Sequence, residues 1–460
     1  MVISLKNEVE RYRYGIYHLL KMIFPYDVVV VNGENSDVEL SYAVGKSSVT
    51  VFFGEKVHEE PIIRDDVLLS LKRAVYRVTG ATLPFGVLTG VRPSQTALKF
   101  DTDVVKNLEE VYLVSSQKGE IMERCAKRVR AVQNRLSKKQ ISLYIHIPFC
   151  PSRCKYCSFT LAYLKPYSQL IDGYLEALLT ELSGVLQTVS ECDLQLASVY
   201  IGGGTPTVLT EQQLRRLLEK LAAFPMPKEF SVEAGRADTV TEEKLRLMKE
   251  YGVSRVSINP QTLNQKTLEL IGRRHSVEDF YRAYDWAKKI GFDTINTDLI
   301  AGLGEETYSD FTHSLDGILS LSPEHITVHT LCNKRTSALV EQGDVHKAEE
   351  VGKMLRYTYE KLMPLYEPYY IYRQKEAISS LENVGFMKNN QECMYNIFMM
   401  EEASSVIAVG AGGTSKLIDF TDKKPFAKLR TDKQPERYMR DLALTLPKKQ
   451  AFMMENCHRI

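Results

Sequence analysis

The sequence predicts an α/β protein built around a partial (β/α)6 barrel, with an α+β domain before the barrel and a mixed α/β region after it. Three observations lead to this fold class: short apolar runs alternate with amphipathic helical patterns from Ser142 onward, six such repeats follow one another, and polar residues gather where the runs end. Strands that alternate with helices form a parallel sheet that closes toward a barrel. Six repeats instead of eight predict an open barrel with a lateral cleft for a large substrate.

The chain has 460 residues, 44% of them hydrophobic, which is enough for two or three domains with their own cores. We expect an N-terminal domain over residues 1–140, the barrel over 141–335 and a C-terminal region over 336–460. The expected barrel strands are Leu143–Ile147, Ser198–Ile201, Glu229–Val232, Arg255–Ile258, Thr294–Ile300 and His325–His329. The helices between them include Tyr167–Gln187, Glu211–Ala223, Glu242–Tyr251 and Val277–Ile290.

The first 140 residues carry the strand and helix patterns of a small α+β domain. Asp27–Asn32 is a β-branched run, and Val38–Phe53 predicts a hairpin of two strands. Ile62–Val78 has apolar residues at helical spacing and ends just before a glycine. The charged segment Gln117–Lys139 predicts a connecting helix. The loop Leu83–Pro93, rich in Gly and Pro, suits either a functional role or plain docking.

Three cysteines follow the first barrel strand closely: Cys150, Cys154 and Cys157. Their spacing suits neither a structural zinc site, which needs four ligands in paired units, nor a disulfide ladder. Three thiolates can hold three corners of a four-iron cluster and leave one iron open to a non-protein ligand. Ordinary buried cysteines are the alternative, since cysteine is common in protein cores. The flanking Arg153 and Lys155 favour the cluster, because reactive thiols lie in exposed, electropositive loops.

Glycine and polar residues follow the other strands at their carboxyl ends, where barrel enzymes carry their chemistry. Gly202–Pro206 follows the second strand, and its glycines permit either close approach of a ligand or simply a tight turn. Glu233 follows the third strand, Gln261 follows the fourth, and Asp298 lies near the end of the fifth. Any one of these residues could be structural, but their ordered recurrence at strand ends predicts a site.

The composition limits the location and the partners of the protein. A formal net charge of +1 gives no reason to expect nucleic acid or an anionic membrane as the main partner. No apolar run approaches the roughly 18 residues of a membrane span. Eight cysteines without regular pairing, and no charged-then-apolar leader, predict a reduced, cytoplasmic location. We expect a monomer.

The segment Tyr144-Ile-His-Ile-Pro-Phe-Cys150, with its CxxxCxxC spacing, resembles the radical S-adenosylmethionine (SAM) enzymes. More narrowly, residues 140–420 resemble the oxygen-independent coproporphyrinogen III dehydrogenase (HemN-like) family, and the N-terminal extension is similar to that of its HemZ-type subgroup. The resemblance implies a [4Fe–4S] cluster on Cys150, Cys154 and Cys157, with SAM on the fourth iron and a second SAM molecule in members that hold two. An electron from the cluster would cleave SAM to methionine and a 5′-deoxyadenosyl radical.

The resemblance also implies roles for residues around the first SAM molecule. Gly203, Gly204 and Thr205 match the GGxTP motif that borders the methionine amino group. Glu233 matches a carboxylate that binds the ribose, and Tyr144 matches a residue that contacts SAM near the open iron.

The second SAM molecule has its own matching residues. Tyr156 matches a position near it, and Gln261, Arg273 and Asp298 match residues that bind it. His146 shares a strand face with the tyrosine two residues before it. It is either a core histidine or a group that handles protons near a substrate carboxylate.

The C-terminal region begins with an expected helix, Ala348–Leu365. Three further segments resemble the part of the family that closes one side of the barrel mouth: Tyr370–Lys375, Glu392–Asn396 and Ser405–Ser415. Tyrosines and Arg373 at a cleft rim would suit a flat tetrapyrrole with carboxylate arms, because Arg binds carboxylates bidentately. Packing is the alternative for the tyrosines.

The implied reaction converts coproporphyrinogen III to protoporphyrinogen IX in porphyrin biosynthesis, with a flavodoxin or ferredoxin as electron donor. The adenosyl radical removes a β-hydrogen from a propionate, and loss of carbon dioxide and one electron leaves a vinyl group, twice per substrate. The family's dehydrogenases carry a further cysteine two residues past the third ligand, where this chain has Phe159. Haem chaperones and radical SAM enzymes that methylate and open haem also lack it, so both remain alternatives.

Overall fold

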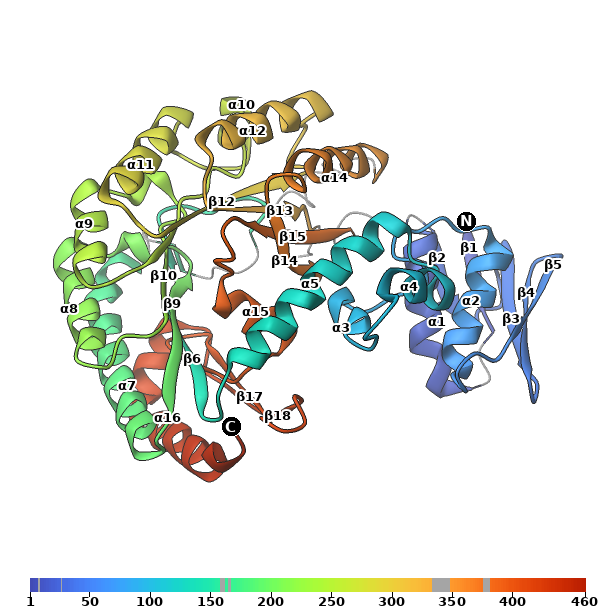
Figure 1. The fold of residues 1–460 in the computed structure, drawn as a ribbon, viewed down its shortest axis with the longest axis horizontal. Coiled ribbons are helices and arrows are strands. Elements are labelled where there is room, and N and C mark those ends of the chain that lie inside the picture. The colour runs from blue at the N-terminus through green and yellow to red at the C-terminus, as the bar shows by residue number, and fades with distance from the viewer. Residues whose placement is uncertain (7–8, 26, 158–161, 164–166, 333–347, 375–380) are drawn as a thin grey trace. The chain divides into compact units, whose positions relative to one another are not determined.

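The computed structural model describes residues 1–6, 9–25, 27–157, 162–163, 167–332, 348–374 and 381–460 (Figure 1). Two compact units are present. Unit 1 consists of Met1–Lys127 with Ile371–Lys375, and unit 2 consists of Arg128–Tyr370 with Glu376–Ile460. The division expected at residues 140 and 335 stays a prediction. Phe159 lies outside the described residues.

Unit 1 contains a five-stranded sheet in the order β2-β1-β3-β4-β5. Strand β1 lies between β2 and β3 and pairs in parallel with both, whereas β3, β4 and β5 form an antiparallel meander. The strands are β1 (Val2–Leu5), β2 (Val28–Val31), β3 (Val38–Val44), β4 (Ser48–Phe53) and β5 (Lys56–Pro61). The helices are α1 (Glu10–Ile23), α2 (Val67–Thr79), α3 (Pro93–Ala97) and α4 (Val104–Tyr112).

The start of α2 differs from the expected residue. The Asp66 side chain accepts the Leu69 amide at 2.9 Å, so the helix begins at Val67 and not at Ile62. It ends at Thr79 and is capped by Gly80, which has a left-handed backbone conformation (φ +69°) and is the glycine expected to stop the helix. The connecting helix α5 (Ser116–Arg135) ends at Arg135, four residues before the expected end at Lys139.

The loop Leu83–Pro93 holds Arg373. The Arg373 guanidinium donates to the Leu88 carbonyl at 2.6 Å and lies over the Phe85 ring, 4.4 Å from its centroid. Its backbone amide donates to the Val91 carbonyl at 2.8 Å. Arg373 is buried and bound by the chain itself, so the expectation that it lies at an open cleft rim is wrong.

The larger sheet has 11 strands in the order β14-β15-β13-β12-β11-β10-β9-β6-β16-β17-β18. Its centre consists of six parallel strands that neighbour one another in chain order. They are β6 (Gln140–Ile147), β9 (Gln195–Gly203), β10 (Glu229–Glu233), β11 (Arg255–Ser257), β12 (Thr294–Ala301) and β13 (His325–Thr330). The predicted fold class, an α/β protein with a partial (β/α)6 barrel, is confirmed.

Helices cover the outer side of this curved sheet (Figure 1). They are α7 (Ile171–Glu191), α8 (Glu211–Ala222), α9 (Glu242–Glu250), α10 (Gln265–Leu270), α11 (Val277–Ile290) and α12 (Tyr308–Leu321). Three of them begin at capping boxes, whose first residues are Thr210, Ser276 and Thr307. These local signals explain why the expected boundaries lie close to the observed ones.

The C-terminal part extends the sheet on both sides. β15 (Glu382–Met387) pairs antiparallel with β13, and β16 (Val406–Val409) pairs in parallel with β6. The remaining elements are β14 (Glu367–Arg373), β17 (Thr414–Ile418), β18 (Pro425–Arg430), α14 (Ala348–Leu362), α15 (Met394–Glu401) and α16 (Pro435–Asn456). In the part of the chain that is described, no helix is long and apolar enough to cross a membrane.

Candidate functional site

The three cysteines lie on one short loop at the carboxyl end of β6, beginning at the two-residue strand β7 (Phe149–Cys150). The Cys150 sulfur lies 3.3 Å from the Thr205 hydroxyl oxygen, and the Cys157 amide donates to the Cys154 carbonyl at 3.0 Å. Cys154 is buried, whereas the other two thiols are partly exposed. The described residues contain no group of three His, Cys, Asp or Glu side chains around one metal ion. A four-iron cluster is larger than a single ion, so thiolates at its corners are farther apart.

This cysteine loop is docked on the turn before α11. The Ser152 hydroxyl donates to the Gly272 carbonyl at 3.1 Å, and the Lys155 amide donates to the Ile271 carbonyl at 2.9 Å. Gly272 has φ +77°, a conformation that favours glycine. The loop position is therefore set by backbone groups of a neighbouring strand–helix connection.

The glycine segment after β9 lies beside the cysteine loop. The Gly204 amide donates to the Ile147 carbonyl at 2.7 Å, and the Thr205 amide donates to the Phe149 carbonyl at 2.8 Å. A side chain at Gly204 would meet the Phe149 carbonyl oxygen at 2.5 Å. The segment thus needs glycine for close backbone packing against the residues that lead into Cys150.

His146 is enclosed between two glycine segments. Its Nδ1 is hydrogen-bonded to the Ala411 carbonyl oxygen, and a Cβ atom at Gly203 (φ +112°) would overlap its ring. Its ring stacks on Tyr144 with centroids 5.8 Å apart, so both residues share one face of β6, as expected. Burial lowers the pKa of His146, which keeps the ring neutral at pH 7.

Tyr144 belongs to an aromatic stack that the sequence did not reveal. The Tyr395 ring, from α15, lies 5.4 Å from the Tyr144 ring and 4.1 Å from the Tyr200 ring, centroid to centroid. Burial raises the pKa of Tyr144 well above its ordinary value. Tyr200 lies on the expected second strand, but nothing in the sequence connects Tyr395 to that strand.

Glu233, at the end of β10, accepts two hydrogen bonds beside this stack. The Tyr200 hydroxyl donates to Oε1 at 2.7 Å, and the Gly203 amide donates to Oε2 at 3.2 Å. Burial, with a smaller contribution from the charge of Asp298, raises the pKa of Glu233 to about 7. The hydrogen bonds from Tyr200 and Gly203 act against this rise and lower the pKa. At neutral pH the carboxyl group can therefore accept or donate a hydrogen bond to a ligand.

Arg273 and Asp298 both contact Asn259, and Gln261 is connected to Asp298 through its backbone. Arg273 Nη1 donates to the Asn259 carbonyl at 2.5 Å and to the Gly235 carbonyl at 3.2 Å. Asn259 Nδ2 donates to Asp298 Oδ2 at 2.8 Å, and the Gln261 amide donates to the Asp298 carbonyl at 3.0 Å. Arg273 Nε and Asn259 Oδ1 are buried and have no hydrogen-bond partner among the described residues.

Two further contacts connect this group to its surroundings. Arg273 Nη2 donates to the Tyr156 hydroxyl at 3.0 Å, which links the group to the cysteine loop. His329 Nε2 lies 3.7 Å from Asp298 Oδ2. Burial alone would raise the pKa of Asp298, but His329 and Asn296 outweigh it and lower that pKa. His329 was missed in the sequence, although it lies at the end of the sixth expected strand.

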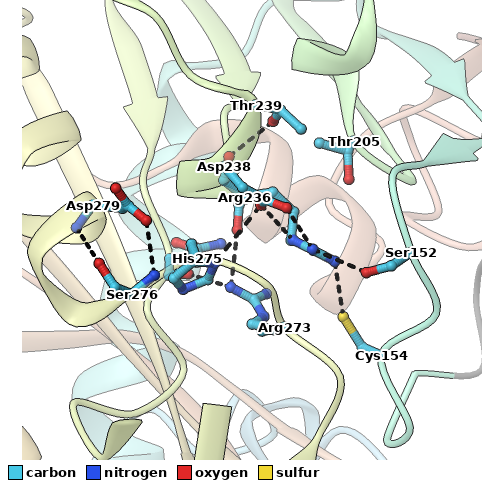
Figure 2. Close-up of polar contacts among 12 residues, drawn as sticks. Ser152, Cys154, Thr205, Arg236, Asp238, Thr239, Arg273, His275, Ser276 and Asp279 are labelled. Atoms are coloured by element: carbon cyan, nitrogen blue, oxygen red, sulfur yellow. Dashed lines mark hydrogen bonds and ion pairs between the residues drawn. The ribbon is translucent and has the colours of Figure 1, made fainter. Parts of the chain in front are cut away.

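Arg236 is a further functional candidate that the sequence did not reveal (Figure 2). Its Nη1 donates to the Cys154 sulfur at 3.3 Å and its Nη2 to the Ser152 hydroxyl at 3.1 Å. Asp238 accepts from Nε at 2.9 Å and from Nη2 at 2.8 Å. Arg236 follows the end of β10 by three residues, so the strand-end rule that indicated Glu233 could have found it.

A parallel α/β barrel with a three-cysteine loop and a glycine segment at the carboxyl ends of its strands defines a class of enzyme that uses an iron–sulfur cluster with SAM. Residues 144–318 match the Radical SAM superfamily. The chain is 38% identical over 379 residues to the oxygen-independent coproporphyrinogen-III oxidase-like protein HemZ of Bacillus subtilis, covering 78% of this chain and 75% of that one. It is 33% identical over 300 residues to the heme chaperone HemW of the same organism, covering 62% and 77%.

The chain therefore belongs to the HemN-like family of radical SAM proteins. The fold agrees with this assignment. The solved structure of coproporphyrinogen III oxidase (HemN) from Escherichia coli superposes with a TM-score of 0.54 at 22% identity, covering 70% of this chain and 73% of that one. Membership in the family implies a [4Fe–4S] cluster and SAM.

Proposed function

We propose that the protein is an oxidoreductase that decarboxylates coproporphyrinogen III to protoporphyrinogen IX without oxygen. The observation that carries the proposal is the meeting of the cysteine loop, Gly203–Thr205, Glu233 and Arg273 at the carboxyl ends of the parallel strands. Barrel enzymes bind their substrates at this edge. The relative named as an oxygen-independent coproporphyrinogen-III oxidase-like protein supports the choice of reaction. A propionate arm would lose a hydrogen atom, carbon dioxide and one electron to become a vinyl group.

The loop thiols of Cys150, Cys154 and Cys157 would hold the cluster. Hydroxyl and guanidinium groups stand beside two of the sulfurs, an environment that suits thiolates. When bound, the cluster supplies the electron that cleaves SAM to methionine and a 5′-deoxyadenosyl radical. The protein's own task is to orient the reactants and to exclude water.

The first SAM molecule would lie against Tyr144, the Gly203–Thr205 backbone and Glu233. This segment would border the methionine part of SAM through its backbone. It needs glycine, because a side chain at Gly203 or Gly204 would collide with His146 or with the Phe149 carbonyl. Glu233 would bind the ribose hydroxyls, and its pKa of about 7 suits hydrogen bonding in either direction.

A second SAM molecule would be bound by Tyr156, Gln261, Arg273 and Asp298. Buried polar atoms without partners are rare in folded proteins. Among the described residues, Arg273 Nε and Asn259 Oδ1 are such atoms, one a donor and the other an acceptor. They fit a polar ligand at this position.

His146 and Tyr144 are our candidates for catalytic residues. With Nδ1–H donated to the Ala411 carbonyl, the neutral ring of His146 keeps a lone pair on Nε2. That nitrogen could accept a proton near a substrate carboxylate. The stacked phenol of Tyr144 would orient the ring.

We further propose a cytoplasmic monomer that receives electrons from a flavodoxin or ferredoxin. All eight cysteines are described and none forms a disulfide, as a reduced compartment favours. The three-part domain division at residues 140 and 335 belongs to the same proposal, with the C-terminal region closing the barrel mouth.

The similarity to the heme chaperone HemW favours a second candidate, a haem-binding chaperone without dehydrogenase activity. A radical SAM enzyme that methylates or opens haem is the third. Anaerobic incubation of reconstituted protein with coproporphyrinogen III, SAM and dithionite separates the three. Protoporphyrinogen with methionine and 5′-deoxyadenosine supports the dehydrogenase, and S-adenosylhomocysteine supports the methyltransferase. Stoichiometric haem binding without tetrapyrrole turnover supports the chaperone and contradicts the proposed reaction.

A further inference from the structure

Arg236 joins a cysteine of the cluster loop to the Asp238 carboxylate, which is partly exposed. The Arg236 side chain is 4% exposed. Its guanidinium donates two parallel hydrogen bonds to the Asp238 carboxylate, from Nε at 2.9 Å and from Nη2 at 2.8 Å. Two bonds to one carboxylate fix the plane of a guanidinium, and with it the direction of its remaining N–H groups. Nη1 then points at the Cys154 sulfur, 3.3 Å away (Figure 2). The contact is built by the fold and is not the chance contact of a mobile surface side chain.

We infer that Arg236 is a positioning residue that sets the reduction potential of the cluster through its hydrogen bond to Cys154. The inference rests on cluster ligation by the loop cysteines, which is part of the proposed function. Hydrogen bonds to the cysteine sulfurs and the local charge set the potentials of iron–sulfur clusters. A reduced cluster carries one more negative charge than an oxidised one. A cationic donor at a ligand sulfur therefore stabilises the reduced state and raises the potential.

The negative charge of Asp238 affects the reduction potential of the cluster in the opposite direction to the positive charge of Arg236. Its carboxylate holds Arg236 in place and also cancels part of the positive charge near Cys154. His275 faces Asp238 from the other side, with Nδ1 3.7 Å from Oδ1. Burial lowers the pKa of His275, so its ring stays neutral and adds no charge of its own. Arg236 and Asp238 should therefore shift the potential in opposite directions when each is neutralised alone.

The test is a potentiometric titration of the reconstituted cluster, in which electron paramagnetic resonance monitors the reduced state. The iron and sulfide content per chain is measured in the same samples. In Arg236→Met we expect about a tenfold lower ratio of reduced to oxidised cluster at a fixed potential. For a one-electron couple this corresponds to a midpoint about 59 mV more negative. In Asp238→Asn the midpoint should move in the positive direction. Arg246→Met is the matched control, because Arg246 forms an exposed ion pair with Glu242 on α9.

A purely structural role for Arg236 predicts a different pattern. Equal midpoints in wild type and Arg236→Met at equal iron content would overturn the inference, as would shifts of the same sign in Arg236→Met and Asp238→Asn. Should Arg236→Met hold no iron, Arg236→Lys and Arg236→Gln replace it. The lysine variant keeps the positive charge, so its midpoint potential must lie closer to that of the wild type than the midpoint of the glutamine variant does. Equal midpoints in the two variants refute the inference.

This test is independent of the proposed reaction, because the titration of the cluster needs no tetrapyrrole substrate. Opposite shifts in a protein that leaves coproporphyrinogen III unchanged would support the role of Arg236 and refute the decarboxylation. A wild-type chain that binds no iron or sulfide would overturn both.

Discussion

Glu181 and Lys449, 268 residues apart in the sequence, form an ion pair whose side chains are only 3% and 4% exposed. Glu181, on α7, also accepts the Gly410 amide at 2.7 Å, and Lys449, on α16, also donates to the Ala408 carbonyl at 2.7 Å. The pair thus ties the last helix to β16 and to the glycine turn that follows it. The Ala411 carbonyl of that turn is the partner of the His146 ring.

Replacing Lys449 by Met should therefore destabilise unit 2. The substitution leaves the Glu181 carboxylate buried without its cation, and breaking a buried pair in this way costs about 3–5 kcal/mol. Urea denaturation followed by circular dichroism measures the loss. Arg440→Met is the control, since Arg440 pairs with Asp441 at the surface and should cost less than about 1 kcal/mol. A loss as small as that of the control would contradict the stabilising role of the pair.

Cys154→Ala should abolish the brown colour of the reconstituted protein, which iron–sulfur charge transfer produces near roughly 400 nm. Two ligands cannot hold a cluster that three ligands hold with one open iron. Iron and sulfide analysis and the absorption spectrum measure the effect. Cys457→Ala, at a partly exposed cysteine far along the chain from the loop, should keep the wild-type iron content. Full iron retention in Cys154→Ala would refute the ligand assignment.

Gly203→Ala should weaken SAM binding at least about tenfold, or about 1.4 kcal/mol. The backbone at this position has φ +112°, and an added methyl group would overlap the His146 ring. Relief of the overlap must move the segment that would carry the methionine part of SAM. Anaerobic equilibrium dialysis with labelled SAM measures the affinity. Gly352→Ala on α14 is the control, because its Cβ would meet only Arg356 Nη1 at 3.7 Å.

Glu306 should make the folding stability depend on pH. Burial raises the pKa of this carboxyl group to about 7, although Thr262 donates a hydrogen bond to it. The pKa in the folded chain lies above that in the unfolded chain, so proton binding favours the folded state. This contribution is complete below the unfolded value near 4.5 and is lost as the pH rises through about 7.

Glu306→Gln removes this dependence, because an amide does not titrate. Relative to wild type, the variant should gain stability between pH 5 and pH 8, by up to about 3 kcal/mol. Urea midpoints at the two pH values test this. Glu305→Gln, at the exposed neighbouring residue, should follow the wild-type curve. Parallel curves for wild type and Glu306→Gln would show that Glu306 does not titrate in this range.

The barrel could be predicted from sequence because its signals are local. Its strands are short apolar runs, and the helices between them begin at capping boxes such as Ser276–Asp279. The cysteine spacing and the strand-end residues are also local patterns. Tyr395 could not be found in this way, because it reaches the Tyr200 ring from α15, almost 200 residues further along the chain. The last helix, α16, was missed, although its Lys449 pairs with Glu181, the residue that accepts the Gly410 amide of the glycine turn beside the site.

Unit 1 is assembled from two separate stretches of the chain, Met1–Lys127 and Ile371–Lys375. An N-terminal fragment that stops at Lys127 would lack the Arg373 guanidinium, which donates to the Leu88 carbonyl and lies over the Phe85 ring. The unit is thus no detachable module. Any chimera that exchanges it between relatives has to transplant the distant five-residue piece together with the first 127 residues.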